Sequence, residues 1–161
     1  MVSVFVAREP IGRILAGDAW VNKYYPGLKR NGSSTEEMWW KFANADKITD
    51  NYALRILAGN GCCSGNNTSR EHLETAKDVV KRFTFVLDIE CLNEGMVALA
   101  DILDLPINRT AMKPAVRHGS SRDRIPHEKV YEHLVQKNRL DIELYEWSKT
   151  LSLVNCTALP R

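Results

Sequence analysis

The chain has 161 residues and a formal charge of +2, from 22 Lys and Arg residues against 20 Asp and Glu residues. This length suits one domain with a single hydrophobic core. A composition of 44% hydrophobic and 26% charged residues excludes a disordered or collagen-like chain. The near-neutral charge argues against a nucleic-acid partner. No uncharged apolar run is long enough to span a membrane, and no signal peptide is recognisable.

The predicted elements begin with a strand, a tight turn and a helix. Residues 2–7 are almost all apolar or β-branched, which is typical of a strand buried on both faces of a parallel sheet. Pro10 is favourable at the first position of a helix, and an apolar stripe extends that helix to about residue 21. Further helices are predicted over 36–45, where we assign the tryptophans to the core, and over 51–59.

A second strand and four more helices follow. Thr68 and Glu71 have the spacing of a capping box at the start of a helix that reaches about residue 82. The apolar run 83–87 predicts a strand, and Pro126 is expected to begin a helix. Helix, strand, helix is the unit of a parallel sheet, so we expect an α/β fold with a short parallel sheet flanked by helices and a helix-rich C-terminal half. The remaining two helices are predicted over 93–103 and 140–154.

Two strands are too few for a complete sheet. We therefore expect one partial domain over residues 1–161, with at least two or three further strands before Val2.

The sequence contains more N-glycosylation sequons than chance predicts. Five asparagines are followed two places later by Ser or Thr, where about one is expected by chance. This excess favours a secretory lumen, and the alternative is chance in turns rich in Asn and Thr. The four cysteines lack the spacing of a zinc site, so a disulfide among them is a hypothesis without a connectivity. The asparagines are Asn31, Asn66, Asn67, Asn108 and Asn155, and the cysteines are Cys62, Cys63, Cys91 and Cys156.

The turn after the first strand is a candidate anion site. Arg8 lies at the expected carboxyl end of that strand, where a following helix directs unpaired N–H groups at a ligand. Its guanidinium can hold a phosphate or sulfate with two hydrogen bonds. In the alternative interpretation, Arg8 and Arg13 pair with Glu9 and Asp18 on the surface.

The segment 109–129 is a second candidate anion site. It carries six Lys and Arg residues against two acids, a charge of +4. His118, Ser120 and Ser121 lie among them and add donors that could surround a polyanion. Most basic loops are simply solvated, which is the alternative. The segment contains no aromatic residues between the basic ones, so a small phosphate or an acidic sugar fits it better than nucleic acid.

Two other groups are weaker candidates. Asp88 and Glu90 follow the second strand and could form a carboxylate pair, although an acid in this position is more often a helix cap or an ion-pair partner. His127 and His133 are six residues apart, so they do not share a helix face.

The segment Arg8-Glu9-Pro10-Ile11-Gly12-Arg13 resembles the strand-turn-helix of carbohydrate sulfotransferases. In that family an Arg-Asp-Pro-x-x-Arg-x-x-Ser pattern binds the 3′-phosphate of 3′-phosphoadenosine-5′-phosphosulfate. Three later segments match in the same order: Asn51-Tyr52 with Arg55, then 85–90, then 138–145. The pattern is most similar to the Golgi uronyl and galactosyl branch.

The resemblance implies a partial P-loop-like three-layer fold and transfer of a sulfuryl group from that donor to a carbohydrate hydroxyl in the Golgi. It implies that Arg8 binds the donor's 3′-phosphate. It also implies that a late basic loop closes over donor and glycan. The further donor ligands are Ser120, Ser121 and Arg122, and the ligands of the carbohydrate are Arg55, Arg117 and His118.

The chain departs from the family pattern at three points. Ala16 stands where the family has Ser, which removes one phosphate hydrogen bond, and Glu9 replaces Asp. The family's loop for the 5′-phosphosulfate and its catalytic base lie upstream of the motif. We therefore expect the later part of an enzyme, weakly active or inactive alone. The alternative is a non-catalytic lumenal protein that binds a glycan or a partner on the same scaffold.

Overall fold

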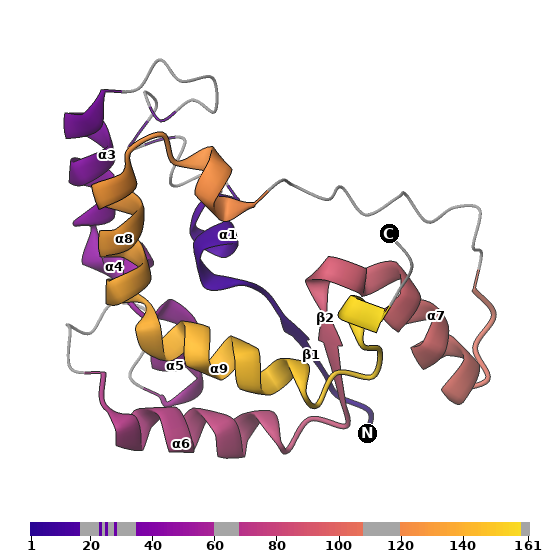
Figure 1. Ribbon diagram of the computed structural model, residues 1–161. Coiled ribbons are helices and arrows are strands. Elements are labelled where there is room, and N and C mark those ends of the chain that lie inside the picture. The colour runs from indigo at the N-terminus through magenta and orange to yellow at the C-terminus, as the bar shows by residue number, and fades with distance from the viewer. Residues whose placement is uncertain are drawn as a thin grey trace.

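The structure is a computed structural model that describes residues 1–16, 23, 25, 28, 35–59, 68–107 and 120–158. Two strands, β1 (Val4–Ala7) and β2 (Phe85–Asp88), pair in parallel with Val4 opposite Phe85 and Ala7 opposite Asp88. Because parallel strands point the same way, their carboxyl ends meet at one edge of the sheet. Helices make up most of the remaining described chain (Figure 1).

The predicted α/β class, with a short parallel sheet flanked by helices and a helix-rich C-terminal half, is confirmed. In the described part of the chain, short 3₁₀ helices cover Ile89–Cys91, Ser121–Arg124 and Cys156–Ala158. The α-helices are α1 (Pro10–Ile14), α3 (Glu36–Ala43), α4 (Asp46–Thr49), α5 (Tyr52–Leu57), α6 (Arg70–Val80), α7 (Leu92–Ile102), α8 (Glu128–Lys137) and α9 (Arg139–Lys149).

Helices lie on both faces of the sheet. A Cβ atom added to Gly95 of α7 would lie 3.1 Å from the Leu87 side chain, so α7 packs closely on the face to which Leu87 points. Asp88 points to the opposite face because side chains alternate along a strand, and there it accepts a hydrogen bond from Tyr145 of α9. The sheet is therefore the middle of three layers.

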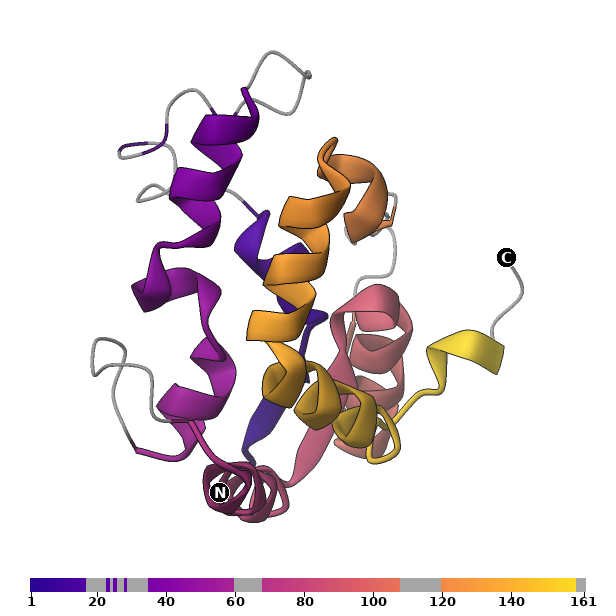
Figure 2. The same ribbon diagram turned by 60° about the vertical axis from the view of Figure 1, so that its left-hand side comes forward.

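Two buried clusters hold the helices together. In the first, α1 packs against α3 and α8, and Trp39 is 5% exposed, as expected of a core residue. In the second, α5, α6 and α9 meet around Leu54 and Leu144. Only Asn138 separates α8 from α9, and Figure 2 shows the bend between the two helices at this point.

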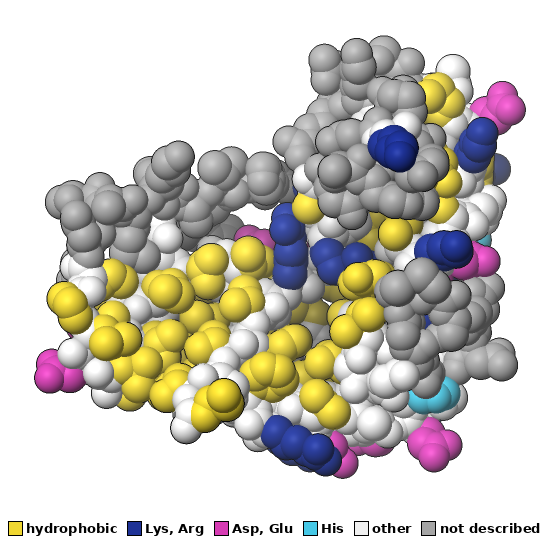
Figure 3. Space-filling model, turned by 180° about the vertical axis from the view of Figure 1, so that it is seen from behind, with side chains coloured by type: hydrophobic (Ala, Val, Ile, Leu, Met, Phe, Trp, Pro, Cys, Tyr) yellow, Lys and Arg dark blue, Asp and Glu magenta, His cyan; other side chains and the backbone are white. Residues whose placement is uncertain are grey.

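The expectation that the first strand is buried on both faces is wrong. Val4 and Val6 of β1 are 37% and 43% exposed, although Leu87 on the same face of β2 is fully buried. The reason is that α7 covers β2, and no described element covers this face of β1. Figure 3, which shows the molecule from behind, has a broad area of hydrophobic side chains on its left, the side on which α7 lies.

Several predicted helix ends are also corrected. The capping box of α6 consists of Ser69 and His72 rather than Thr68 and Glu71. The N-cap of α8 is His127, so this helix begins two residues after Pro126.

The first and last helices are shorter than predicted. Helix α1 ends at Ile14, and residues 17–21 of the longer predicted helix lie outside the described residues. Helix α9 ends at Lys149 because the chain then turns beside β2, where Leu153 donates its backbone N–H to Val86.

A disulfide joins Cys91, at the start of α7, to Cys156 near the C-terminus, with 5.4 Å between the two Cα atoms. This gives the disulfide hypothesis a specific pair. Cys62 and Cys63 lie outside the described residues. Among the described helices, none is long and apolar enough to cross a membrane.

Candidate functional site

The four segments that carry the sulfotransferase resemblance meet in space. They lie far apart in the chain, yet hydrogen bonds join α5 to α9 and β2 to α9. The turn after β1 lies against the same helices, in a pocket described below. This junction lies at the carboxyl edge of the sheet, where open α/β sheets bind their ligands.

Asp141 of α9 caps the start of α5. Its carboxylate accepts the backbone N–H of Ala53 at 3.0 Å and that of Leu54 at 2.7 Å, two groups that have no partner within their own helix. Burial raises the pKa of Asp141, opposed by these two hydrogen bonds and by the charges of Arg13 and Arg55. The carboxylate therefore fixes α5 relative to α9.

Asn51 links the same two helices from the other side. Its backbone adopts the left-handed region, with φ of 37°, which Asn tolerates better than most residues. Its Oδ1 accepts the backbone N–H of Asp141, and its own backbone N–H donates to Oδ1 of Asn138. Three further bonds run from its Nδ2 to Asp50, Thr68 and Lys137. This network makes the Asn51 and Asn138 segments one structural unit.

Two arginines, Arg8 and Arg13, lie beside this unit. Arg13 of α1 donates to the Ile48 carbonyl at 3.1 Å, and its guanidinium lies 4.6 Å from the centre of the Tyr52 ring. Burial lowers the pKa of Arg13. The charges of Asp141 and Tyr52 oppose that effect, and those of Arg55 and Arg8 add to it. Arg8 and Arg13 thus bring two positive charges to the turn after β1, where Glu9 and Asp141 add carboxylates.

A small pocket of about 110 Å³ opens at this point. Arg8 and Arg13 line it from the turn after β1, Ala53 from α5, and Asp141 and Tyr145 from α9. Among the described residues, no hydrogen bond or ion pair engages the Arg8 guanidinium. The volume suits a phosphate or sulfate group and is well below that of a pocket for a whole nucleotide.

Glu9 limits the anion-binding capacity of this turn. Its carboxylate accepts the backbone N–H of Ile11 at 2.9 Å and that of Gly12 at 2.5 Å, and it also accepts the hydroxyl of Ser121 at 2.5 Å. A Cβ atom at position 12 would lie 3.0 Å from Oε2 of Glu9, so Gly12 permits this close approach. The carboxylate therefore occupies the N–H groups at which an anion was expected.

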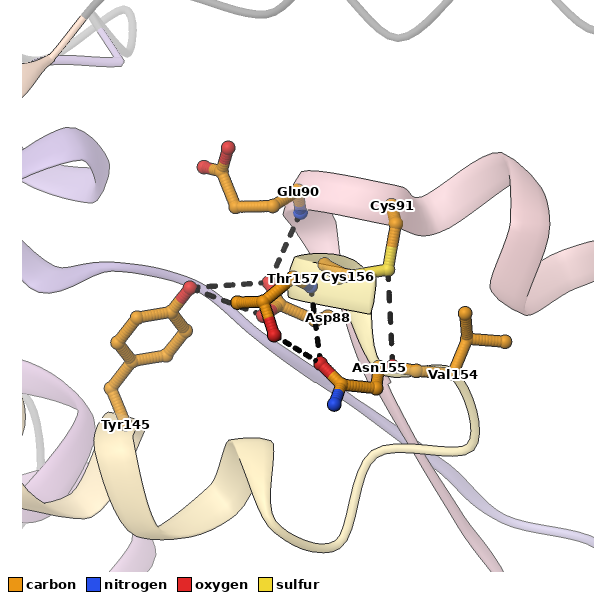
Figure 4. Close-up of a disulfide and its surroundings, with 8 residues drawn as sticks. All are labelled: Asp88, Glu90, Cys91, Tyr145, Val154, Asn155, Cys156 and Thr157. Atoms are coloured by element: carbon orange, nitrogen blue, oxygen red, sulfur yellow. Dashed lines mark hydrogen bonds between the residues drawn. A yellow bond between two sulfur atoms is a disulfide. The ribbon is translucent and has the colours of Figure 1, made fainter. Parts of the chain in front are cut away.

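Asp88, the last residue of β2, caps the 3₁₀ helix Ile89–Cys91, as the alternative to a carboxylate pair with Glu90 predicts. Its Oδ1 accepts the backbone N–H of Glu90, and both its oxygens lie 3.2–3.3 Å from the Tyr145 hydroxyl (Figure 4). Burial, and secondarily the charge of Asp88, raises the pKa of Tyr145. A wider pocket of about 590 Å³ opens beside this pair, lined also by Glu146 and Asn155. Three acids against one lysine, Lys149, in its lining disfavour anionic ligands.

The predicted site residues separate into three groups. Arg8 lines the small pocket, whereas Arg55 is 2% exposed and donates to the carbonyls of Asp46 and Lys47, so it supports α4. Ser120 caps the 3₁₀ helix Ser121–Arg124 by accepting the N–H of Arg122. Arg117 and His118 lie outside the described residues.

Among the described residues of the late basic segment, Ser121 reaches the turn after β1. Ser121 contacts Glu9, as described above. Arg122 instead pairs with Glu128 and lies 5.0 Å from the centre of the Tyr131 ring. The structure therefore brings Ser121 to the turn after β1 and engages Arg122 on α8.

Sequence reasoning missed Arg13 as a pocket residue and Asp141 and Tyr145 as its neighbours. The four-residue spacing of Asp141 and Tyr145 places them on one face of a helix, which was the available signal. No three His, Cys, Asp or Glu residues in the described part of the chain are grouped to hold a metal ion.

Comparison with known proteins gives no match: no family model, no curated protein and no solved structure matches this chain. The functional argument therefore rests on the residues and on the geometry of this site.

Proposed function

We propose that this chain is a sulfotransferase-like protein that binds the 3′-phosphate of 3′-phosphoadenosine-5′-phosphosulfate and serves sulfuryl transfer to a carbohydrate hydroxyl. The observation that carries the proposal is the meeting of the four resembling segments at the carboxyl edge of the sheet.

Two arginines make the small pocket a candidate for the phosphate end of the donor, although most of its lining is apolar and Asp141 adds a carboxylate. Arg8 supplies a guanidinium without a described partner, and Arg13 adds a second positive charge that is fixed by its contacts with Ile48 and Tyr52. The donor supplies a sulfuryl group activated by its phosphate leaving group. In this proposal Ser120, Ser121, Arg122, Arg117 and His118 belong to the loop that approaches donor and glycan.

Compartment and partner follow from the same proposal. The disulfide Cys91–Cys156 is typical of proteins that fold in an oxidising compartment, which supports a lumenal location such as the Golgi. The carbohydrate acceptor is the partner that the resemblance implies.

Two observations favour the second candidate, a non-catalytic lumenal protein that binds a glycan or a partner. Glu9 places a carboxylate beside Arg8 and uses the N–H groups of Ile11 and Gly12. Ala16 also lacks the hydroxyl that the family pattern has at this position. Both features weaken phosphate binding without affecting the scaffold.

Two measurements on the purified chain separate the candidates. Calorimetric titration with adenosine 3′,5′-bisphosphate is expected to show binding that Arg8→Ala weakens and that Arg82→Ala, at an exposed arginine outside the pocket, retains. Transfer of radiolabelled sulfate to desulfated glycans is then assayed. Nucleotide binding supports the sulfotransferase-like proposal, whereas calorimetric binding of the same glycans without nucleotide binding supports the second candidate.

A further inference from the structure

The segment after α9 is fixed at two places. Ser152 forms a parallel bridge with Val86, and Leu153 donates its backbone N–H to the Val86 carbonyl at 2.9 Å. Three residues later, Cys156 is bonded to Cys91. Asn155 lies between these two attachments, on the surface. The position from which its side chain projects is therefore defined by the fold.

Asn155, Cys156 and Thr157 form the one sequon that lies within the described part of the chain. Oδ1 of Asn155 accepts the Thr157 hydroxyl at 2.7 Å and the Thr157 backbone N–H at 3.1 Å. No hydrogen bond among the described residues engages Nδ2 of Asn155, and no dashed line reaches it in Figure 4. The amide is thus polarised at its oxygen and open at its nitrogen.

We propose that Asn155 is an N-glycosylation acceptor, and that closure of the Cys91–Cys156 disulfide ends its reactivity. The co-reactant is a polyprenyl-diphosphate-linked oligosaccharide, used by a membrane oligosaccharyltransferase. A bond forms between Nδ2 and C1 of the first sugar, and the bond between C1 and the diphosphate oxygen breaks. The polyprenyl diphosphate leaves, and one Nδ2 proton passes to a base of the transferase.

The disulfide limits the reaction because its cysteine is the middle residue of the sequon. A transferase must accommodate the three residues of the sequon in its own cleft. Once Cys156 is bonded to Cys91, which is 2% exposed, the sequon is held against the start of α7 and in the 3₁₀ helix Cys156–Ala158. The glycan must therefore be added before the disulfide closes.

A glycan on Asn155 remains compatible with the disulfide afterwards. No described residue bonds Nδ2, so the added sugar does not displace the two hydrogen bonds from Thr157. Asn155 also lines the wider pocket beside Asp88, so the first sugar lies at the rim of that pocket. The inference requires a secretory lumen and does not depend on nucleotide binding.

The test uses the full chain with a cleavable signal peptide appended, translated in the presence of microsomes. The lumenal protein is treated with peptide N-glycosidase in ¹⁸O-labelled water, which marks each formerly glycosylated asparagine as labelled aspartate. Mass spectrometry of the peptide containing residue 155 gives the modified fraction. Peptide-level detection keeps the other four sequons from affecting the result.

The expected result is a labelled fraction at Asn155 in the natural chain, a larger fraction in Cys91→Ala, and the same gain in Cys156→Ser, which keeps the sequon. Thr157→Ala should lose the label, and Thr157→Ser should retain it. Because modification precedes folding, these readouts survive even where a variant folds poorly. An unlabelled Asn155 in Cys91→Ala overturns the acceptor assignment. Equal fractions with and without Cys91 overturn the role of the disulfide.

Discussion

The hydroxyl of Ser121 donates a hydrogen bond to Oε2 of Glu9 at 2.5 Å, although the two residues are 112 positions apart. The same carboxylate accepts two backbone N–H groups of α1. Glu9 therefore caps α1 and also fixes the start of the 3₁₀ helix Ser121–Arg124 against it. Both roles oppose anion binding at the turn after β1, because the carboxylate already occupies the N–H groups of Ile11 and Gly12.

Glu9→Ala should lower stability and raise anion affinity together. Loss of the cap is expected to reduce the free energy of unfolding by about 0.5–2 kcal/mol. Loss of the negative charge removes repulsion of an anion beside Arg8 and Arg13, so adenosine 3′,5′-bisphosphate should bind more tightly. Urea denaturation and calorimetric titration measure the two effects.

The matched control is Glu132→Ala, an exposed glutamate within α8. It should change the free energy of unfolding by less than about 0.5 kcal/mol and leave the nucleotide affinity unchanged. A Glu9→Ala protein with the stability and affinity of this control would contradict the assigned role of Glu9.

Asp141→Asn should destabilise the junction of α5 and α9. An asparagine keeps one acceptor oxygen and turns a donor NH₂ towards the second backbone N–H, so one of the Ala53 and Leu54 groups loses its partner. The expected loss is about 1–3 kcal/mol in the free energy of unfolding. Glu146→Gln, an exposed position on the same helix, is the control and should lose much less. Equal losses in both variants would refute the capping role.

Tyr145 should titrate above the ordinary tyrosine value of 10.0, because burial and the charge of Asp88 raise its pKa. A raised pKa in the folded state means that the unfolded chain releases this proton first. The tyrosine therefore lowers stability as the pH rises above about 10. Alkaline absorbance titration of the natural chain and Tyr145→Phe measures the phenolate signal. The natural chain and Tyr145→Phe should give the same phenolate absorbance near pH 10. A larger absorbance of the natural chain at that pH would contradict the predicted burial.

The disulfide should contribute a large part of the stability. Cys91 and Cys156 are separated by 65 positions, for which the loop-entropy estimate is about 4 kcal/mol. Cys91→Ala and Cys156→Ala should each lower the free energy of unfolding by a similar amount. The double variant should lose little more than either single variant, because both remove the same bond. Additive losses, or labelling of both thiols without reductant, would show that the bond is absent.

Local signals in the sequence predicted the elements well. Apolar runs located both strands, and the order of helix and strand gave the α/β class. The errors arose where neighbouring residues compete for one role: Thr68 and Ser69 both carry a cap hydroxyl, and only Ser69 caps α6. Burial of β1 on both faces could not be decided either, since composition does not say which side a helix covers.

The site could be predicted only in part, for the same physical reason. Arg8 follows from its position after a strand, but the approach of Arg13 to Asp141 joins residues 128 positions apart. Such a meeting depends on how α1, α5 and α9 pack. The pairing of Cys91 with Cys156 likewise depends on the turn after α9, which brings the C-terminal segment beside β2.

The most direct test of the proposed function is the preference for the 3′-phosphate. We compare the affinities of adenosine 3′,5′-bisphosphate and adenosine 5′-monophosphate for the natural chain, Arg8→Ala and Arg82→Ala. The natural chain and Arg82→Ala should prefer the bisphosphate. Arg8→Ala should weaken bisphosphate binding by roughly tenfold to a hundredfold, with monophosphate binding unchanged, as expected for loss of a charged hydrogen bond. Equal affinities for the two nucleotides, or a preference that survives Arg8→Ala, would contradict the proposed phosphate site.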